Sequence, residues 1–126
     1  MCVFDIQVQF QSGLAEVLPD DVEKTELAIE DVMGHVLLKL FDGGVVEDVT
    51  LQRAPGPQTR RSRYLVQIRV HCPCQQFVLF PRTQENMRSE MQKKTYRMLK
   101  ELLTSIEVET ITRVAAPWQA AECYVY

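Results

Sequence analysis

The stretch that most constrains the fold is Arg63 to Cys72, RYLVQIRVHC, in which two kinds of side chain alternate. In an extended strand, alternate side chains point to opposite faces. One face would carry Tyr64, Val66, Ile68, Val70 and Cys72, and the other Leu65, Gln67, Arg69 and His71. The pattern predicts a central strand with one dry face and one wetter face.

The first half of the chain predicts a strand, a helix and a second strand. Residues 2–10 alternate between apolar and polar side chains, which is typical of a half-buried antiparallel strand. Ser12-Gly13 and Pro19 predict a turn over 11–19. An apolar stripe predicts a helix over 20–42, with Asp20 as its N-cap and Gly43-Gly44 as its stop. Residues 45–52 are rich in β-branched side chains and predict the next strand.

The second half predicts two more strands beyond the central one, and a long helix. Residues 54–62 hold two prolines and a basic cluster, which favours an exposed hairpin loop. Pro73 should end the central strand, and 76–80 is then predicted as its hairpin partner. A helix with Thr83 as N-cap follows, with an inward stripe that includes Met87, Met91, Met98 and Leu99. Residues 107–114 predict a last strand.

These elements predict a single α+β domain over residues 1–126, in the order β-α-β-β-β-α-β. The expected architecture is a two-layer sandwich, with a mostly antiparallel sheet and both helices on one of its faces. At 126 residues such a chain can bury a core without staples. The tail, residues 115–126, is left unassigned, with a short extra strand at 123–126 as one option.

Charge is divided unevenly along the chain. Residues 1–50 carry eleven acidic residues and two lysines, a net charge of −9, whereas residues 51–126 have a net charge of +6. No apolar run reaches the roughly 18 residues of a membrane span, and no signal peptide is evident at the N-terminus. We expect a soluble intracellular protein, cytoplasmic rather than secreted and not bound to a membrane, with its four cysteines reduced.

Cysteine and histidine offer one candidate metal site, made of His71, Cys72, Cys74 and Cys123. Thiolates and imidazoles are zinc ligands, but structural zinc sites usually repeat a pair of cysteines two to four residues apart. Strand alternation would also direct His71 and Cys72 to opposite faces. We therefore favour a strand end with one buried cysteine over a metal site, and expect no cofactor.

Motifs for catalysis are missing from the sequence. It contains no GxSxG, HExxH, GxxxxGK[ST] or GxGxxG pattern, and its two histidines are His35 and His71. Paired carboxylates occur at Asp20-Asp21, Glu30-Asp31 and Glu47-Asp48. Their surroundings favour a solvated acidic surface over acid/base catalysis, so the sequence predicts a protein that is not an enzyme.

Basic residues suggest RNA as one candidate ligand. They come from the predicted hairpin loop and from one helix, and would be Arg60, Arg61, Arg63, Arg88, Lys93, Lys94, Arg97 and Lys100. The order helix, three strands, helix resembles that of double-stranded RNA-binding domains, and Lys93, Lys94 and Arg97 resemble the basic cluster of their second helix. The resemblance implies phosphate binding. The alternative is that Glu85, Glu90 and Glu101 form ordinary surface pairs with these cations.

A protein-interaction module is the main hypothesis. The acidic and basic halves would suit electrostatic docking of a partner protein or of a second copy, as in a homodimer. Aromatic side chains of the tail, Trp118, Tyr124 and Tyr126, are residue types enriched at interfaces, although they can equally fill the domain's own core. We therefore expect a noncatalytic adaptor or small assembly subunit that uses the open sheet face or a sheet edge, with RNA binding as the alternative.

Overall fold

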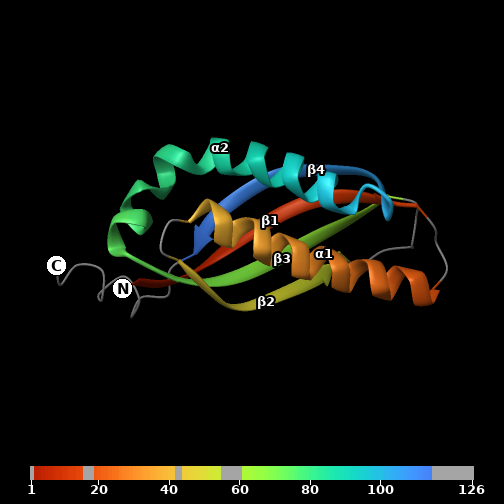
Figure 1. Cartoon of the computed structure of the whole chain (residues 1–126), viewed down its shortest axis with the longest axis horizontal. Helices are drawn as coiled ribbons and strands as arrows, with labels where there is room; N and C mark the ends of the chain where they lie inside the picture. The colour runs from red at the N-terminus through yellow and green to blue at the C-terminus, as the bar shows by residue number, and fades with distance from the viewer. Residues whose placement is uncertain (1, 16–18, 42–43, 55–60, 115–126) are drawn as a thin grey trace.

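A computed structural model describes residues 2–15, 19–41, 44–54 and 61–114. The elements follow in the order β1 (Cys2–Leu14), α1 (Pro19–Leu40), β2 (Val45–Arg53), β3 (Arg61–Cys72), α2 (Cys74–Leu99) and β4 (Leu103–Val114). The strands form one antiparallel sheet in the order β2-β3-β1-β4. Both helices cover the same side of this sheet (Figure 1). The predicted α+β fold class is confirmed, and the order of strands and helices is that of the ferredoxin-like fold.

The two central strands meet in register, so their dry faces form one continuous surface. β1 and β3 pair from Cys2 opposite Cys72 to Gly13 opposite Arg61. Side chains on their helix-facing side are fully or almost fully buried, and they include Phe4, Ile6, Val8, Phe10, Tyr64, Val66, Ile68 and Val70. The alternation in residues 63–72 therefore does predict the centre of the core. Neither α1 nor α2 covers the other face of the sheet (Figure 1).

Helix α1 lies close to β2 because residue 34 is a glycine. A Cβ atom at Gly34 would lie 2.8 Å from Cγ2 of Val49, closer than real Cβ contacts come. The glycine costs helix stability, about 1 kcal/mol relative to alanine, but it lets the strand approach the helix. The observed helix begins one residue before the predicted start and ends two residues before the predicted end.

The predicted turn over 11–19 is partly wrong, because β1 continues to Leu14. Ser12 is buried, and its hydroxyl donates a hydrogen bond of 3.1 Å to the carbonyl of Ser105 on β4. Gly13 keeps its pairing with both neighbouring strands. A Ser-Gly pair is typical of a turn, but pairing with β3 and β4 holds this one in the sheet.

The strand predicted over 76–80 is corrected to helix, since α2 begins at Cys74 and continues through this segment. The observed order is therefore β-α-β-β-α-β. Phe80 is buried, and its ring stacks on Phe41 with centroids 6.2 Å apart. Phe41 in turn meets Phe4 edge-on at 5.9 Å. The short apolar run fits both the helical period and the alternation of a strand, so it does not decide between them. The aromatic contact with the core favours the helix.

Two further details of α2 differ from the prediction. Thr83 is not an N-cap, because it lies inside the helix and its hydroxyl donates to the carbonyl of Phe80. Met98, expected inside, is 52% exposed, whereas Met87, Met91 and Leu99 are buried as predicted. The predicted stripe was too wide at the end of the helix, which stops at Leu99.

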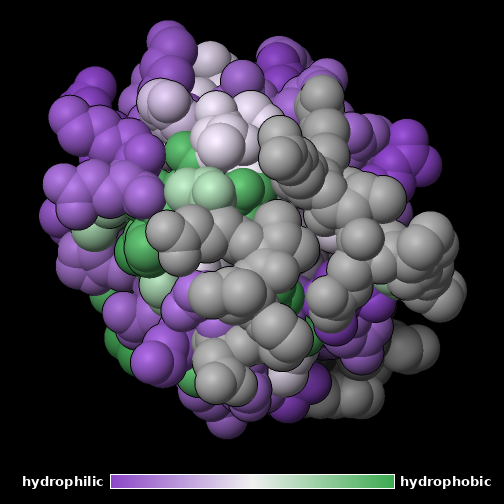
Figure 2. All heavy atoms as spheres, turned by 90° about the vertical axis from the view of Figure 1, so that its right-hand side faces the viewer, coloured by the Kyte–Doolittle hydropathy of each residue, from purple (hydrophilic) through white to green (hydrophobic). Residues whose placement is uncertain are grey.

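Some predicted features fall outside the described residues. They are most of the basic loop, the tail with Trp118, Tyr124 and Tyr126, and the short strand expected at 123–126. In the described part of the chain, neither helix combines the length and apolar character needed to cross a membrane. The end of the molecule where α1 begins and α2 finishes is mainly polar, with a few apolar residues near its middle (Figure 2).

Candidate functional site

The β4 edge of the sheet is closed by side chains of α2. Gln92 Oε1 accepts a hydrogen bond of 3.0 Å from the amide of Val108, and Arg88 donates one of 2.9 Å to the carbonyl of the same residue. Gln84 donates in the same way to the carbonyl of Ile111. A strand edge offers unpaired backbone groups to other chains, and covering them prevents such pairing. Sequence reasoning missed this role of α2.

The β2 edge is treated differently. The amide of Leu51 turns away from β3 and donates a hydrogen bond of 3.2 Å to Oε2 of Glu30 on α1. Alternate residues of a strand point their backbone groups to the same side, so Val49 also turns its amide and carbonyl outward. Among the described residues, no side chain bonds these groups of Val49. Part of the β2 edge is therefore available for hydrogen bonding.

An acidic groove lies between α1 and this part of β2. It has a volume of about 420 Å³ and is lined by Glu30, Asp31, Gly34, His35, Leu38, Val46, Glu47, Asp48 and Val49. Its four carboxylates come from two elements, two from α1 and two from β2. They are the pairs Glu30-Asp31 and Glu47-Asp48, for which the sequence predicts a solvated acidic surface. The fold brings the two pairs together.

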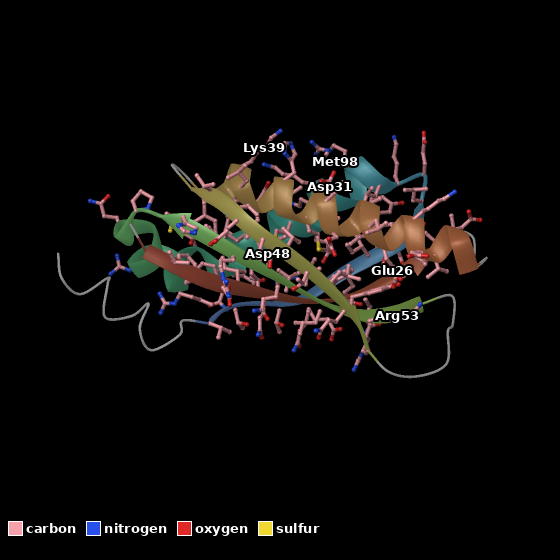
Figure 3. The ribbon with its side chains drawn as sticks, turned by 90° about the horizontal axis from the view of Figure 1, so that it is seen from below. Glu26, Asp31, Lys39, Asp48, Arg53 and Met98 are labelled. Atoms are coloured by element: carbon pink, nitrogen blue, oxygen red, sulfur yellow. The ribbon has the colours of Figure 1, made fainter. Side chains whose placement is uncertain are left out.

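A second, basic groove lies on the other side of α1, against α2. It has a volume of about 210 Å³ and is lined by His35, Val36, Lys39, Lys94, Arg97 and Met98. In Figure 3, Lys39 and Met98 lie on the helix side of the molecule, while Asp48 lies on the strand beneath α1. The charge asymmetry of the sequence therefore becomes two grooves of opposite sign that flank one helix.

The basic residues predicted for RNA binding do not gather on one surface. Arg63 lies on the open sheet face, 3.9 Å from Glu109, because its neighbour Tyr64 points into the core. Arg88 bonds Glu85 and the β4 edge. Lys94 and Arg97 line the basic groove, where Lys94 also lies 3.8 Å from Glu90. Lys93 and Lys100 are exposed, Arg60 lies outside the described residues, and so does the side chain of Arg61.

The open sheet face is polar and its charges are paired with one another. Asp5 accepts hydrogen bonds of 2.9 Å from Gln67 and 3.0 Å from Arg69, and this contact raises the pKa of Arg69. His71 contacts Glu47 on the neighbouring strand. Thr110 and Gln9 meet across β4 and β1. Over β1 and β3, such a face can bind through hydrogen bonds, but it carries little uncompensated charge.

The candidate metal ligands are directed apart. Cys72 is buried in the core, whereas His71 lies on the opposite sheet face. The side chain of Cys74 and all of Cys123 lie outside the described residues. Within the described ranges, no three histidine, cysteine or acidic side chains are grouped closely enough to hold a metal ion.

A buried tyrosine, Tyr64, lies opposite Arg53 at the C-terminal end of β2. Tyr64 stacks on Phe10 with ring centroids 5.2 Å apart, and the nearby Glu26 forms an ion pair of 3.8 Å with Arg53. Figure 3 shows Glu26 and Arg53 at the same end of the molecule. Burial, and next the charge of Glu26, raise the pKa of Tyr64 to about 12. Both effects oppose a negative charge on the phenol.

We expect the stability of the fold to decrease at high pH because of Tyr64. Its pKa is about 12 in the folded chain, against 10.0 ordinarily, so the unfolded chain loses this proton first. The contribution of protonated Tyr64 to the free energy of unfolding is complete below pH 10. It is lost between about pH 10 and 12, and amounts to at most about 2 to 3 kcal/mol. Urea unfolding of the natural chain and of Tyr64→Phe across this range tests it. An equal decline in both would show that Tyr64 is not responsible.

Comparisons with known proteins give no family. No family model matches the chain, and no curated protein sequence matches it. Among solved structures, a 3-hydroxy-3-methylglutaryl-coenzyme A reductase from Streptococcus pneumoniae is 18% identical, with a TM-score of 0.35 over 82% of this chain and 24% of the reductase. A de novo designed protein with a ferredoxin fold is 14% identical, with a TM-score of 0.35 over 91% of this chain and 85% of the design. The chain thus spans about a quarter of the reductase, and function has to be argued from its own residues.

Proposed function

We propose that the chain is a noncatalytic protein-interaction module, an adaptor or a small assembly subunit, that binds an extended segment of another protein along β2. The difference between the two sheet edges carries this proposal. Side chains of α2 bond the edge groups of β4, whereas Val49 on β2 presents its backbone groups beside a groove. An available strand edge is a template on which a partner segment adds as a further strand.

Glu30 of α1 already occupies one hydrogen-bonding position along the β2 edge. Its carboxylate accepts the hydrogen bond of the Leu51 amide, in the place that a carbonyl of an added strand would take. The residues before it, Val46 to Val49, line the groove and are not covered in this way by α1. This part of β2 holds a β-bulge between Val46 and Asp48, and the bulge gives Val46 the same outward orientation as Val49. A partner strand would therefore pair with this first part of β2 and end before Leu51, whose amide is already bonded to Glu30.

RNA binding is the second candidate, and the basic groove is the observation that favours it. Lys39, Lys94 and Arg97 lie together there and could contact phosphates. RNA-binding sheets of this strand order usually stack bases on aromatic side chains. The central strands here present Gln7, Gln9 and Gln67 at the corresponding open face, which supports RNA less well than protein.

The test compares two substitutions at one edge position. Peptides are first selected on the immobilised chain from a library of random linear sequences. Val49→Pro removes the outward amide and keeps the ladder with β3, since the lost donor faces away from it. Val49→Thr keeps the amide and nearly the same shape. We expect the selected peptides to lose at least about tenfold in affinity for Val49→Pro, about 1.4 kcal/mol, and to bind Val49→Thr almost unchanged.

A second measurement covers the case in which Val49→Pro does not fold. Amide hydrogen exchange of the natural chain, with and without peptide, should show new protection at Val46 and Val49. Protection at α2 and the basic groove instead would contradict binding along β2. The opposite outcome is that selection yields no peptide while the natural chain retains RNA oligomers. If Lys94→Glu with Arg97→Glu in the basic groove then releases the RNA, RNA binding replaces protein binding as the proposed function.

A further inference from the structure

We infer that the segment bound along β2 is basic, with lysine or arginine on both of its faces. This inference rests on the proposed function and names the chemistry of the partner. It comes from the acidic groove, which holds four carboxylates at the available part of the edge. Of the residues that line it, His35 is the only one with a basic side chain.

Both faces of an added strand would meet negative charge. Its side chains would alternate between the two sides of the sheet, as in any strand. On the helix side they would approach Glu30 and Asp31 of α1. On the open side they would approach Asp48, whose β3 partner Arg69 lies on that face, and Glu47, which contacts His71 there. Cations are therefore favoured at successive positions of the partner.

The same carboxylates also act against other occupants. Asp31, Glu47 and Asp48 are exposed, so each contributes little alone, about 0.2 to 1 kcal/mol for a surface pair. Together they raise the local concentration of cationic segments and speed their association, and this effect weakens as salt screens it. An acidic segment at the same edge would face like charges on both sides, which opposes its binding. Charge would thus select the partner, and the backbone of β2 would hold it.

The experiment measures binding of two synthetic peptides by calorimetry at low and at moderate salt. Both are extended seven-residue peptides of valine and threonine with charged residues at alternate positions, lysine in one and glutamate in the other. Asp31→Asn with Asp48→Asn removes two groove charges and leaves Glu30 on Leu51. Glu101→Gln with Glu23→Gln removes the same charge from exposed positions outside the groove. Val49→Pro and Val49→Thr complete the set.

We expect the lysine peptide to bind, the glutamate peptide to bind at least about tenfold more weakly, and added salt to reduce the difference. The groove double variant should lose about five- to tenfold in affinity for the lysine peptide, from two surface pairs, and the control double variant less than about twofold. Equal binding of both peptides to the natural chain, or equal losses in the two double variants, would overturn the inference.

The failure of this inference can be told apart from that of the proposed function. If Val49→Pro abolishes binding of selected peptides while the groove variant does not, strand addition stands and the basic partner is rejected. If the groove variant abolishes binding of the lysine peptide while Val49→Pro matches Val49→Thr, the peptide lies in the groove without pairing to β2. That result rejects strand addition.

Discussion

Replacing Phe80 by alanine is expected to lower the free energy of unfolding by about 3 to 5 kcal/mol, the usual cost of removing a buried phenylalanine ring. Phe80 is 2% exposed, stacks on Phe41 and through it reaches Phe4 of β1. Its loss would leave a cavity between the first turns of α2 and the sheet. Urea unfolding followed by circular dichroism measures the change.

The control for this substitution lies on the same helix. Met98→Ala removes an apolar side chain of similar size at a position that is 52% exposed, so it should change the free energy of unfolding by less than about 0.5 kcal/mol. Similar losses for Phe80→Ala and Met98→Ala would contradict the observed position of Phe80. They would favour a surface location for residues 76–80, as in the hairpin strand that the sequence predicted.

Strands were predictable where one face is dry and the other wet. In β1 and β3 the alternation is complete, and a shift by one residue would place every apolar side chain on the wrong face. The central position of both strands followed from this pattern. The extension of β1 to Leu14 did not, because it depends on the hydrogen bond between Ser12 and Ser105, which are far apart in the sequence.

The first turns of α2 could not be predicted from local pattern. Residues 76–80 are too short and too uniformly apolar to separate a helical period from an alternating one. Pro81 also weighs against a helix at this point, because proline is usually excluded from helix interiors. In the structure it lies inside α2, which curves at its N-terminal part (Figure 1). The buried ring of Phe80, stacked on Phe41, holds this part of α2 against the core.

The acidic groove shows where sequence reasoning about the site ends. Its carboxylate pairs are visible as Glu30-Asp31 and Glu47-Asp48, but nothing local says that a helix and a strand bring them together. That juxtaposition depends on Gly34, which admits Val49 to the surface of α1. The contacts that cover β4 are even harder to predict from the sequence, because glutamines such as Gln84 and Gln92 are typical of any exposed helix surface.

Removing the cover of β4 should produce the second large effect. Arg88→Ala with Gln92→Ala frees the amide and carbonyl of Val108. We expect the free energy of unfolding to fall by about 1 to 3 kcal/mol, since two backbone bonds are lost and the helix is less well held to the sheet. We also expect the apparent mass to rise with protein concentration, because an exposed edge pairs with other chains. Light scattering and urea unfolding measure both.

Lys93→Ala with Lys100→Ala is the matched control, since both lysines are exposed on or just beyond the same helix. It should leave the apparent mass unchanged and change the free energy of unfolding by less than about 0.5 kcal/mol.

The variant Arg88→Ala with Gln92→Ala also tests the proposal for β2. If backbone pairing at an edge is what binds peptides, the variant gains a second such edge, and selected peptides should bind it at two sites instead of one. A single site in the variant would mean that the groove beside β2, and not an available edge as such, makes the binding surface.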